Sequence, residues 1–228
     1  MAPDERRREP PLAPDERRPA ECPDRRSRVE TFAHLASRVM ARVPRLGRVR
    51  LVAVDGPSGA GKTWFADRLA KHLNAPVVHT DDLLDGWADQ FTFWDRLEEQ
   101  VLDALRHGRP ARYRRYQWDR RCFGGEAVTI EPAEVVLMEG VSSARRVIRP
   151  ELSFAIFVSA PPDLRLSRVL ARDGGDDVAF RAYLERWRTA EDRHFATDAT
   201  AAYADLVVDG TAQGCGEEYE QLWRQPPS

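Results

Sequence analysis

The stretch at residues 49–63, VRLVAVDGPSGAGKT, decides the fold of this chain. An apolar run ends at an acidic residue and leads into a glycine-rich loop that fits the pattern G-x-x-x-x-G-K-[ST], with Gly56 and Gly61 as its fixed glycines. Glycines allow the backbone to turn several N–H groups inward, and the helix that follows directs its positive end to the same place. The stretch therefore predicts a strand, a loop that binds nucleotide phosphates, and a helix. The alternative is a glycine-rich turn with an incidental lysine.

The loop and the first residues of the helix form the expected nucleotide-binding set. Lys62 can reach the outer phosphates, and the Thr63 hydroxyl can hold Mg²⁺. Only Lys62 and Lys71 are lysines among the 35 basic residues, so a lysine stands in the loop despite a strong preference for arginine elsewhere. A slim ammonium group fits between phosphates where a planar guanidinium does not. The full set is Gly56, Pro57, Ser58, Gly59, Ala60, Gly61, Lys62, Thr63 and Trp64.

Length and composition exclude several other classes of protein. A chain of 228 residues with 42% hydrophobic residues is expected to form one domain with a real core. The formal net charge of −2 argues against a general nucleic-acid binder, which would usually carry a basic excess. Cys22, Cys122 and Cys215 match no zinc or disulfide spacing, so a reducing cytoplasm is the simplest setting. No apolar run approaches the roughly 18 residues of a membrane span, and the charged N-terminus is unlike a secretory signal.

Residues 1–28 differ from the rest of the chain. They are rich in Pro, Arg, Asp and Glu, and the hexapeptide APDERR occurs in them twice. Because such a segment buries too little apolar surface to offset the entropy lost on ordering, we expect a disordered N-terminal arm. A functional arm that contacts an acidic partner is the alternative. Residues 29–228 are expected to form the single folded domain.

Strands and helices alternate along the folded part. Continuous apolar strands between helices predict a five-stranded parallel sheet with helices on both faces, which is a three-layer α/β fold. Ligands bind such sheets beyond the C-terminal ends of the strands. The expected strands are residues 48–54, 76–79, 134–139, 154–158 and 206–208, and the expected helices are residues 29–43, 62–73, 94–107, 162–172, 177–195 and 217–223.

Acidic residues stand at the ends of two expected strands. Asp81 and Asp82 follow the second strand, where a carboxylate opposite a phosphate loop could take a proton from an attacking hydroxyl and help to position Mg²⁺. Helix capping is the alternative, and both roles can hold, with Asp81 in the reaction and Asp82 as the helix cap. Glu139 ends the third strand, which we expect to lie next to the first, and it suits direct or water-mediated binding of Mg²⁺. A solvated strand end is the other interpretation of Glu139.

The helix after the fourth strand carries a pair of arginines. Arg168 and Arg172 are four residues apart, hence on one face, and Asp173 follows them. Two glycines then predict a mobile flap, so we expect a helical lid at about residues 161–196. Arginines on a flap can neutralise charge on a transferring phosphoryl group and exclude water. A solvated arginine face is the alternative in so arginine-rich a chain.

Residues 113–123, YRRYQWDRRCF, combine aromatic rings with four arginines and one aspartate. Taken alone, the segment suits either a base-stacking surface for RNA or a small-molecule pocket. A phosphate site in the same chain and the lack of a basic excess favour the pocket. Asp95 either faces the same cavity or caps a helix. The expected acceptor-binding residues are Asp81, Asp95, Tyr116, Trp118, Arg120 and Arg121.

These motifs together resemble the uridine kinase-like branch of the P-loop kinases, which includes phosphoribulokinase-like, pantothenate kinase-like and nicotinamide riboside kinase-like enzymes. The resemblance covers roughly residues 49–210. GPSGAGKT resembles the family's phosphate loop, and YRRYQWDRR stands where the family has a tyrosine–aspartate acceptor element. HTDDLL resembles the segment whose first aspartate, here Asp81, is the catalytic base. VVLMEGV resembles the element that gives Glu139 a Mg²⁺ role, and RLSRVLARD resembles a lid helix with functional Arg168 and Arg172.

The resemblance implies a P-loop NTPase fold with a small helical lid. It also implies ATP- and Mg²⁺-dependent phosphoryl transfer to a hydroxyl of a small molecule, above all a nucleoside of the uridine or cytidine type or a related metabolite. With the loop, it places catalysis on Asp81, Lys62, Arg168 and Arg172, and metal binding on Thr63, Glu139 and Asp81. The acceptor side departs from the family pattern at Leu83, Leu84, Gln117 and Arg121, so the acceptor stays open.

Two other functions compete with this one. In a nucleoside monophosphate kinase, the arginines at 112, 114, 115, 120 and 121 could bind an acceptor phosphate. A non-catalytic nucleotide-dependent switch or ATPase is the second, although a GTPase is disfavoured because no NKxD-type guanine motif occurs. We expect a small-molecule hydroxyl acceptor as the partner, with neither nucleic acid nor membrane, a cytoplasmic location, and a homo-oligomer left open.

Overall fold

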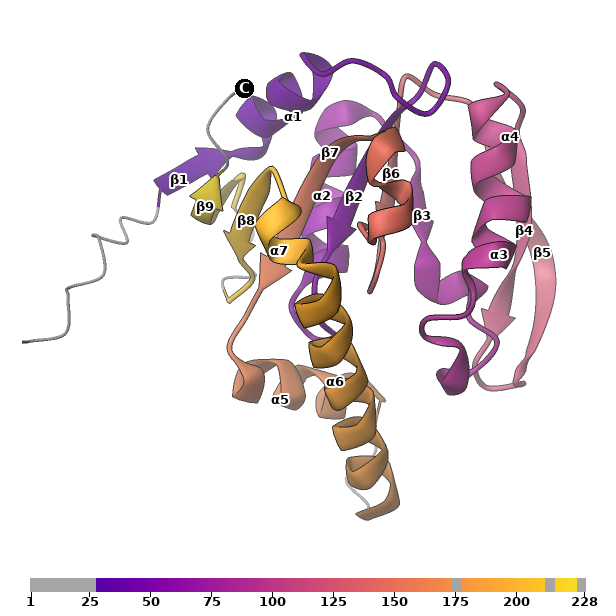
Figure 1. Cartoon of the computed structure of the whole chain (residues 1–228), viewed down its shortest axis with the longest axis vertical. Helices are drawn as coiled ribbons and strands as arrows, with labels where there is room; N and C mark the ends of the chain where they lie inside the picture. The colour runs from indigo at the N-terminus through magenta and orange to yellow at the C-terminus, as the bar shows by residue number, and fades with distance from the viewer. Residues whose placement is uncertain (1–27, 174–177, 212–215, 225–228) are drawn as a thin grey trace, which may run out of the picture.

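The computed structural model describes residues 28–173, 178–211 and 216–224. Five parallel strands form the centre of the sheet, in the order β8-β7-β2-β6-β3 (Figure 1). The expected parallel sheet is thus confirmed, as is the pairing of the third expected strand with the first. These strands are β2 (Arg50–Asp55), β3 (Val77–His79), β6 (Val135–Glu139), β7 (Leu152–Ser159) and β8 (Leu206–Asp209). The expected N-terminal arm, apart from residue 28, lies outside the described residues.

Two antiparallel strands extend the described sheet to seven strands, and both were predicted as helix. The expected helix at 29–43 begins as β1 (Arg28–Thr31) and becomes α1 (Phe32–Met40) only after Thr31, whose side chain accepts a hydrogen bond from the His34 N–H at 3.2 Å. The expected helix at 217–223 is wrong, because the segment forms β9 (Glu218–Arg224), paired with β1 and β8. From Glu218 to Leu222 buried and exposed side chains alternate, and this period of two fits a strand.

Helices cover both faces of the sheet, as expected for a three-layer fold. Alternate side chains of β2 enter opposite cores, with Leu51 and Ala53 on one face and Val52 and Val54 on the other. The helices are α2 (Lys62–Leu73), α3 (Trp94–Leu97) continued by a π turn (Glu98–Leu102) and α4 (Asp103–Arg106), then α5 (Pro162–Asp173), α6 (Val178–Asp198) and α7 (Thr200–Tyr203). Figure 1 shows α5 and α6 reaching beyond the end of the sheet. No helix in the described part of the chain combines the length and apolarity needed to cross a bilayer.

A β-hairpin next to α3 was not predicted. It consists of β4 (Ala111–Gln117) and β5 (Cys122–Ile130), which pair antiparallel as a separate two-stranded sheet. The segment YRRYQWDRRCF, which was expected to line a pocket, therefore extends from β4 through the turn into the start of β5. Ala111 and Tyr113 are buried while Arg112 and Arg114 are exposed, so this strand covers the core with one face only.

Candidate active site

The glycine-rich loop connects the end of β2 to the start of α2, as predicted. Gly56, Gly59 and Gly61 have φ angles of 141°, 75° and 101°, which residues other than glycine rarely adopt. A Cβ at Gly56 would stand 2.2 Å from the carbonyl oxygen of Val158 on β7. The loop therefore depends on glycine both for its shape and for its close approach to the sheet.

A cavity of about 900 Å³ lies between this loop, the ends of β3 and β6, and the helices α5 and α6. It gathers most of the residues expected from the sequence to bind nucleotide, metal or acceptor. Those that line it are Ser58, Gly59, Gly61, Lys62, Thr63, Trp64, Asp81, Trp118, Glu139, Arg168 and Arg172. The cavity thus joins chemistry that the sequence distributes over more than one hundred residues.

Other expected residues do not line this cavity. Gly56, Pro57 and Ala60 belong to the loop but are not among the residues that line the cavity. Asp95 is exposed in the first turn of α3, whose N-cap is Phe93 and which has no side-chain cap hydrogen bond, so Asp95 neither lines the cavity nor caps the helix. Arg120 and Arg121 are exposed at the turn of the hairpin. Tyr116 is buried and packs edge-on against Trp118, with ring centroids 5.1 Å apart.

Glu139 contacts two other polar side chains at the predicted metal site. Its Oε1 accepts a hydrogen bond from the Thr63 hydroxyl at 3.2 Å and lies 2.7 Å from Nδ1 of His79. The hydrogen bond with Glu139 raises the pKa of His79. Sequence reasoning gave His79 no role, although its position at the end of a strand was a usable signal, because His79 and Glu139 are direct neighbours across β3 and β6.

The two aspartates after β3 have different surroundings. Asp81 is exposed on the wall of the cavity, and the desolvation caused by the surrounding protein atoms, together with repulsion from Glu139, raises its pKa. Asp82 forms an ion pair with Arg115 of the hairpin at 3.0 Å. The turn Thr80–Leu83 has no side-chain cap, so Asp82 anchors the hairpin instead of a helix end.

The two arginines of α5 also differ. Arg168 donates to the carbonyl oxygens of Gly59 (3.2 Å), Gly210 (2.8 Å) and Thr211 (2.9 Å), which ties the helix to the phosphate loop. Arg172 forms two hydrogen bonds with Asp173, at 2.7 and 2.9 Å, which raise its pKa. The electrostatic attraction of Asp81 and Glu139 contributes to the same shift, and Arg172 lines the cavity together with these two carboxylates.

Sequence reasoning missed three further residues. Asp55 is fully buried and accepts hydrogen bonds from the backbone N–H groups of Gly56, Ser142 and Ala144 at 2.7, 2.9 and 2.8 Å. Burial raises its pKa to about 6. Its place between an apolar strand and the glycine loop was a signal. Trp87 and Trp187 join Trp118 in an aromatic wall, with Trp87 centroids 4.5 Å from Trp118 and 5.4 Å from Trp187, which no local pattern announces.

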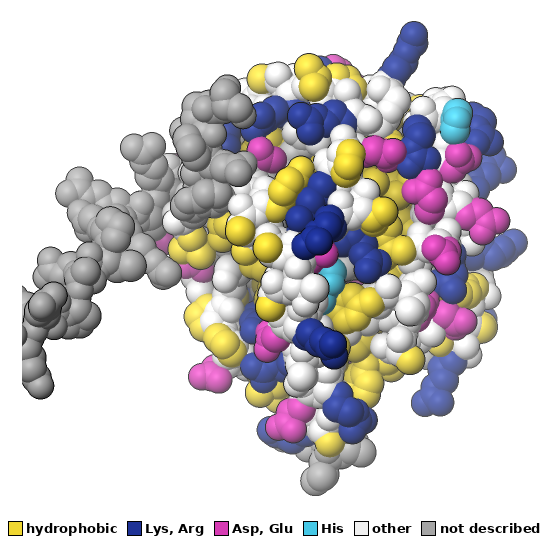
Figure 2. Space-filling view, viewed as in Figure 1, with side chains coloured by type: hydrophobic (Ala, Val, Ile, Leu, Met, Phe, Trp, Pro, Cys, Tyr) yellow, Lys and Arg dark blue, Asp and Glu magenta, His cyan; other side chains and the backbone are white. Residues whose placement is uncertain are grey.

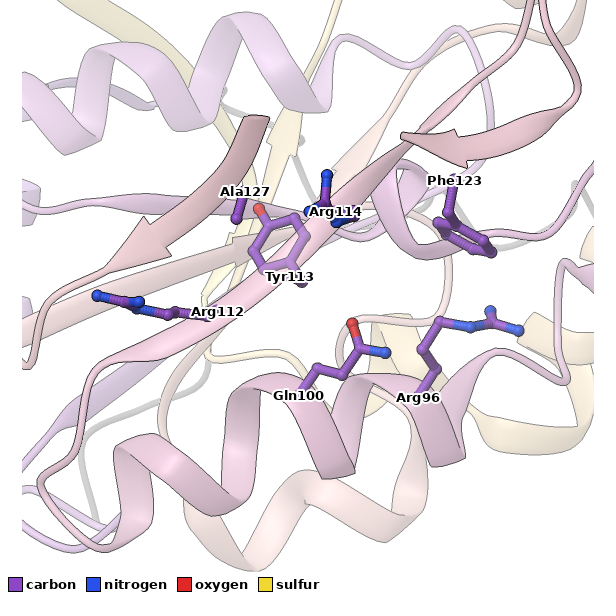
Figure 3. A pocket seen from close by; sticks show the side chains of 7 residues that line it. All are labelled: Arg96, Gln100, Arg112, Tyr113, Arg114, Phe123 and Ala127. Atoms are coloured by element: carbon purple, nitrogen blue, oxygen red, sulfur yellow. The ribbon is translucent and has the colours of Figure 1, made fainter. Parts of the chain in front are cut away.

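Residues of the segment YRRYQWDRRCF line two cavities. Trp118 lines the large one, whereas Tyr113 and Phe123 line a second cavity of about 390 Å³. In Figure 3 the helix side chains Arg96 and Gln100 face the side chains of the hairpin across this space. The described residues contain no cluster of three or more His, Cys, Asp and Glu side chains arranged to hold a metal.

Loop, sheet order and cavity together define a P-loop NTPase-type kinase fold. Residues 89–208 match the profile of the phosphoribulokinase/uridine kinase family, and the chain belongs to that family. A uridine kinase of Schizosaccharomyces pombe is 26% identical over 185 residues, which cover 71% of this chain and 40% of that protein. A uridine kinase of Yersinia pestis is 34% identical over 146 residues, covering 54% and 68%. A possible uridine kinase from Bacillus stearothermophilus has a similar fold, with a TM-score of 0.58 at 20% identity over 77% of this chain and 96% of that one.

Proposed function

We propose that this protein is an ATP-dependent kinase that transfers the γ-phosphoryl group to a hydroxyl of a nucleoside of the uridine or cytidine type, or of a related metabolite. The observation that carries the proposal is the meeting of Lys62, Asp81, Glu139 and Arg172 in one cavity next to the glycine loop. Phosphoryl transfer needs little more than such positioning and electrostatic stabilisation. The uridine kinases among its relatives support a nucleoside acceptor.

The residues present fit a magnesium–nucleotide complex. Mg²⁺ prefers oxygen ligands and is usually held by one or two carboxylates together with phosphates. The Thr63 hydroxyl and the Glu139 carboxylate are 3.2 Å apart, and Asp81 lines the same cavity. The loop backbone approaches the sheet so closely that a side chain at Gly56 would not fit, which suits a cradle of amides. Bound Mg²⁺ would neutralise charge that develops between the outer phosphates.

Each residue then has a distinct task. Asp81 accepts the proton of the acceptor hydroxyl while the acceptor oxygen bonds to the γ-phosphorus and the bond to the β,γ-bridging oxygen breaks. Lys62, whose Nζ donates to the Pro57 carbonyl at 3.2 Å, stands over the loop and can turn to the phosphates. The positive charge of Arg172 can compensate the negative charge on the phosphoryl group during its transfer. Arg168 positions the loop, since three backbone carbonyls already engage it.

The aromatic wall supports a flat acceptor. Trp87 and Trp118 lie next to each other and line the cavity that contains Asp81. A base stacked on such rings is held through its face, which favours a nucleoside over a small polar metabolite. Arg112 and Arg114 face the second cavity and Arg115 pairs with Asp82, which leaves few arginines for an acceptor phosphate. A monophosphate acceptor is therefore the weaker hypothesis.

We predict that Asp81→Asn lowers kcat by at least about a hundredfold while Mg·ATP still binds, because the amide keeps the shape of the site but cannot take the proton. The measurement is transfer of label from γ-labelled ATP to a panel of nucleosides and, separately, to nucleoside monophosphates. Nucleotide affinity is titrated by calorimetry on the same protein.

Lys62→Ala serves as the second variant, with nucleotide binding and turnover both expected to fall while the fold survives. If the label were transferred to a nucleoside monophosphate, the proposed nucleoside acceptor would be wrong and a monophosphate would be the acceptor. Wild-type rates in Asp81→Asn would remove this carboxylate from the mechanism. Slow hydrolysis of ATP that no acceptor accelerates would favour the switch or ATPase.

A further inference from the structure

A buried carboxylate of α6 contacts the phosphate loop. Glu191 has no exposed surface, and its two carboxylate oxygens lie 3.1 and 3.2 Å from the backbone N–H of Ser58, which donates to them. The Ser58 hydroxyl donates to the same carboxylate. Trp187, one turn earlier on α6, donates its indole N–H to Glu191 at 2.8 Å and lies 3.1 Å from Oγ of Ser58. One side chain of α6 thus holds both the backbone N–H and the hydroxyl of Ser58.

Two further segments reach the same carboxylate. The side-chain amide of Gln90, which precedes α3, donates to Glu191 at 3.4 Å. The guanidinium of Arg165 on α5 lies 3.9 Å away, with only 10% of its side chain exposed. These partners of Glu191 all carry N–H or O–H groups and come from the loop, α5, α6 and the segment before α3. A buried carboxylate can persist only with such compensation, and here the loop supplies part of it.

We infer that Glu191 is a positioning residue that shapes the phosphate loop before nucleotide arrives and holds the Trp187 part of the acceptor wall to it. The inference rests on the proposed function, since it concerns how the same cavity binds ATP. Backbone amides bind phosphates well when their directions are fixed in advance, because no ordering then has to accompany binding. Glu191 already accepts the Ser58 N–H, so it fixes the turn of the loop at Ser58 instead of offering that amide to phosphate, and through Trp187 it holds the ring that meets Trp87 in the cavity.

Glutamine is a sharp substitution at this position. It keeps the size of the side chain but exchanges one acceptor oxygen for an N–H₂ group among donors. The amide keeps one acceptor oxygen in place of Oε1, but it removes the charge and sets an N–H₂ group against the Ser58 N–H and Arg165 in place of Oε2, so the hold on the loop weakens while the core keeps its volume. Glu185, on the same helix and exposed, offers the matched control.

The test measures the affinity of the full chain for a non-hydrolysable ATP analogue with Mg²⁺ by calorimetry. We expect Glu191→Gln to bind at least about tenfold more weakly and Glu185→Gln to bind like the wild type, as hydrogen bonds to charged groups are worth about that much. Glu191→Asp, which keeps the charge, should recover part of the loss. A merely structural role would lower the melting temperature and leave the affinity of the folded protein unchanged.

A double-mutant cycle with Ser58→Ala keeps the inference testable if Glu191→Gln folds poorly. Ser58→Ala alone should weaken binding severalfold, and the double variant should lose less than the two single losses added together, because Glu191 acts through Ser58. Equal affinity of Glu191→Gln and wild type, tighter binding by the variant, or additive losses would each overturn the inference and leave the kinase proposal standing. If the wild type itself binds no nucleotide, the kinase proposal fails first and the inference fails with it.

Discussion

Among single residues, Asp55 links the two parts of the candidate site. Its carboxylate holds the first amide of the phosphate loop and two amides of the loop that follows Glu139. Complete burial disfavours the charged form and raises the pKa from 3.8 to about 6, although the three N–H donors and Lys62 act in the opposite direction. The folded protein therefore binds this proton more tightly than the unfolded chain.

The stability contribution of the Asp55 proton is present below about pH 4 and is lost as the pH rises through about 6. We predict that the free energy of unfolding of the wild type falls, relative to that of Asp55→Asn, by on the order of 2 kcal/mol between pH 4 and pH 7. Urea unfolding at a series of pH values measures the difference. Other carboxyls with raised pKa, such as Asp81, titrate in both proteins and cancel. A constant difference across this range would contradict the prediction.

At the scale of elements, helix α5 packs its backbone onto the phosphate loop. A Cβ at Gly59 would stand 2.4 Å from the carbonyl oxygen of Arg165 in α5. Arg168 adds a hydrogen bond from the same helix to the Gly59 carbonyl. The loop is therefore enclosed by α5 as well as by the strands beneath it. The sequence predicted both elements but not this contact, because nothing local to residues 56–63 encodes the distance to a helix one hundred residues later.

We predict that Gly59→Ala destabilises the protein by about 1–3 kcal/mol more than Gly108→Ala does. Gly59 and Gly108 have similar positive φ angles, 75° and 67°, so alanine meets the same backbone strain at both. Only Gly59 has a backbone in its way, since a Cβ at Gly108 meets nothing within 4 Å. Thermal unfolding of the two variants gives the comparison. Equal losses would mean that α5 moves aside freely.

The extent of correct prediction differed between elements for a physical reason. Helix α2 was predicted with its observed bounds, because a glycine loop, a helical apolar pattern and a left-handed Asn74 cap all lie within one short stretch. β9 was predicted as a helix, since one of its two pairing partners, β1, lies at the opposite end of the folded chain. The hairpin β4–β5 was missed because its arginine-rich face hides the alternation of buried residues.

At the scale of the whole molecule, the first and last described strands, β1 and β9, pair with each other and complete one edge of the sheet. Glu30 on β1 is 7% exposed and accepts hydrogen bonds from the side chains of Tyr219 and Gln221 on β9. It also pairs with Arg38 of α1 at 3.0 Å. This cluster lies outside the cavity and connects strands separated by most of the folded chain, so it serves the fold and not the chemistry.

We predict that Glu30→Ala lowers the free energy of unfolding by about 3 kcal/mol, because it leaves buried polar groups of β9 and Arg38 without their partner. Glu220→Ala, on the exposed face of β9, should stay within about 0.5 kcal/mol of the wild type. Denaturant unfolding measures both. Nucleotide affinity below the unfolding transition should not change in either variant, and a change would show that the sheet edge reaches the site.

The sequence by itself determined the phosphate loop, the parallel centre of the sheet, and the acidic residues at the ends of β3 and β6. These features are written in short contiguous patterns, where glycine conformations and apolar periodicity act within one strand or one helical turn. Only the tertiary structure decided the antiparallel edge, the tryptophan wall, the different hydrogen-bond partners of Arg168 and Arg172, and the contact of Glu191 with Ser58. Those contacts join residues about thirty to more than one hundred and eighty positions apart, and the packing of the folded chain, not any local preference, brings them together.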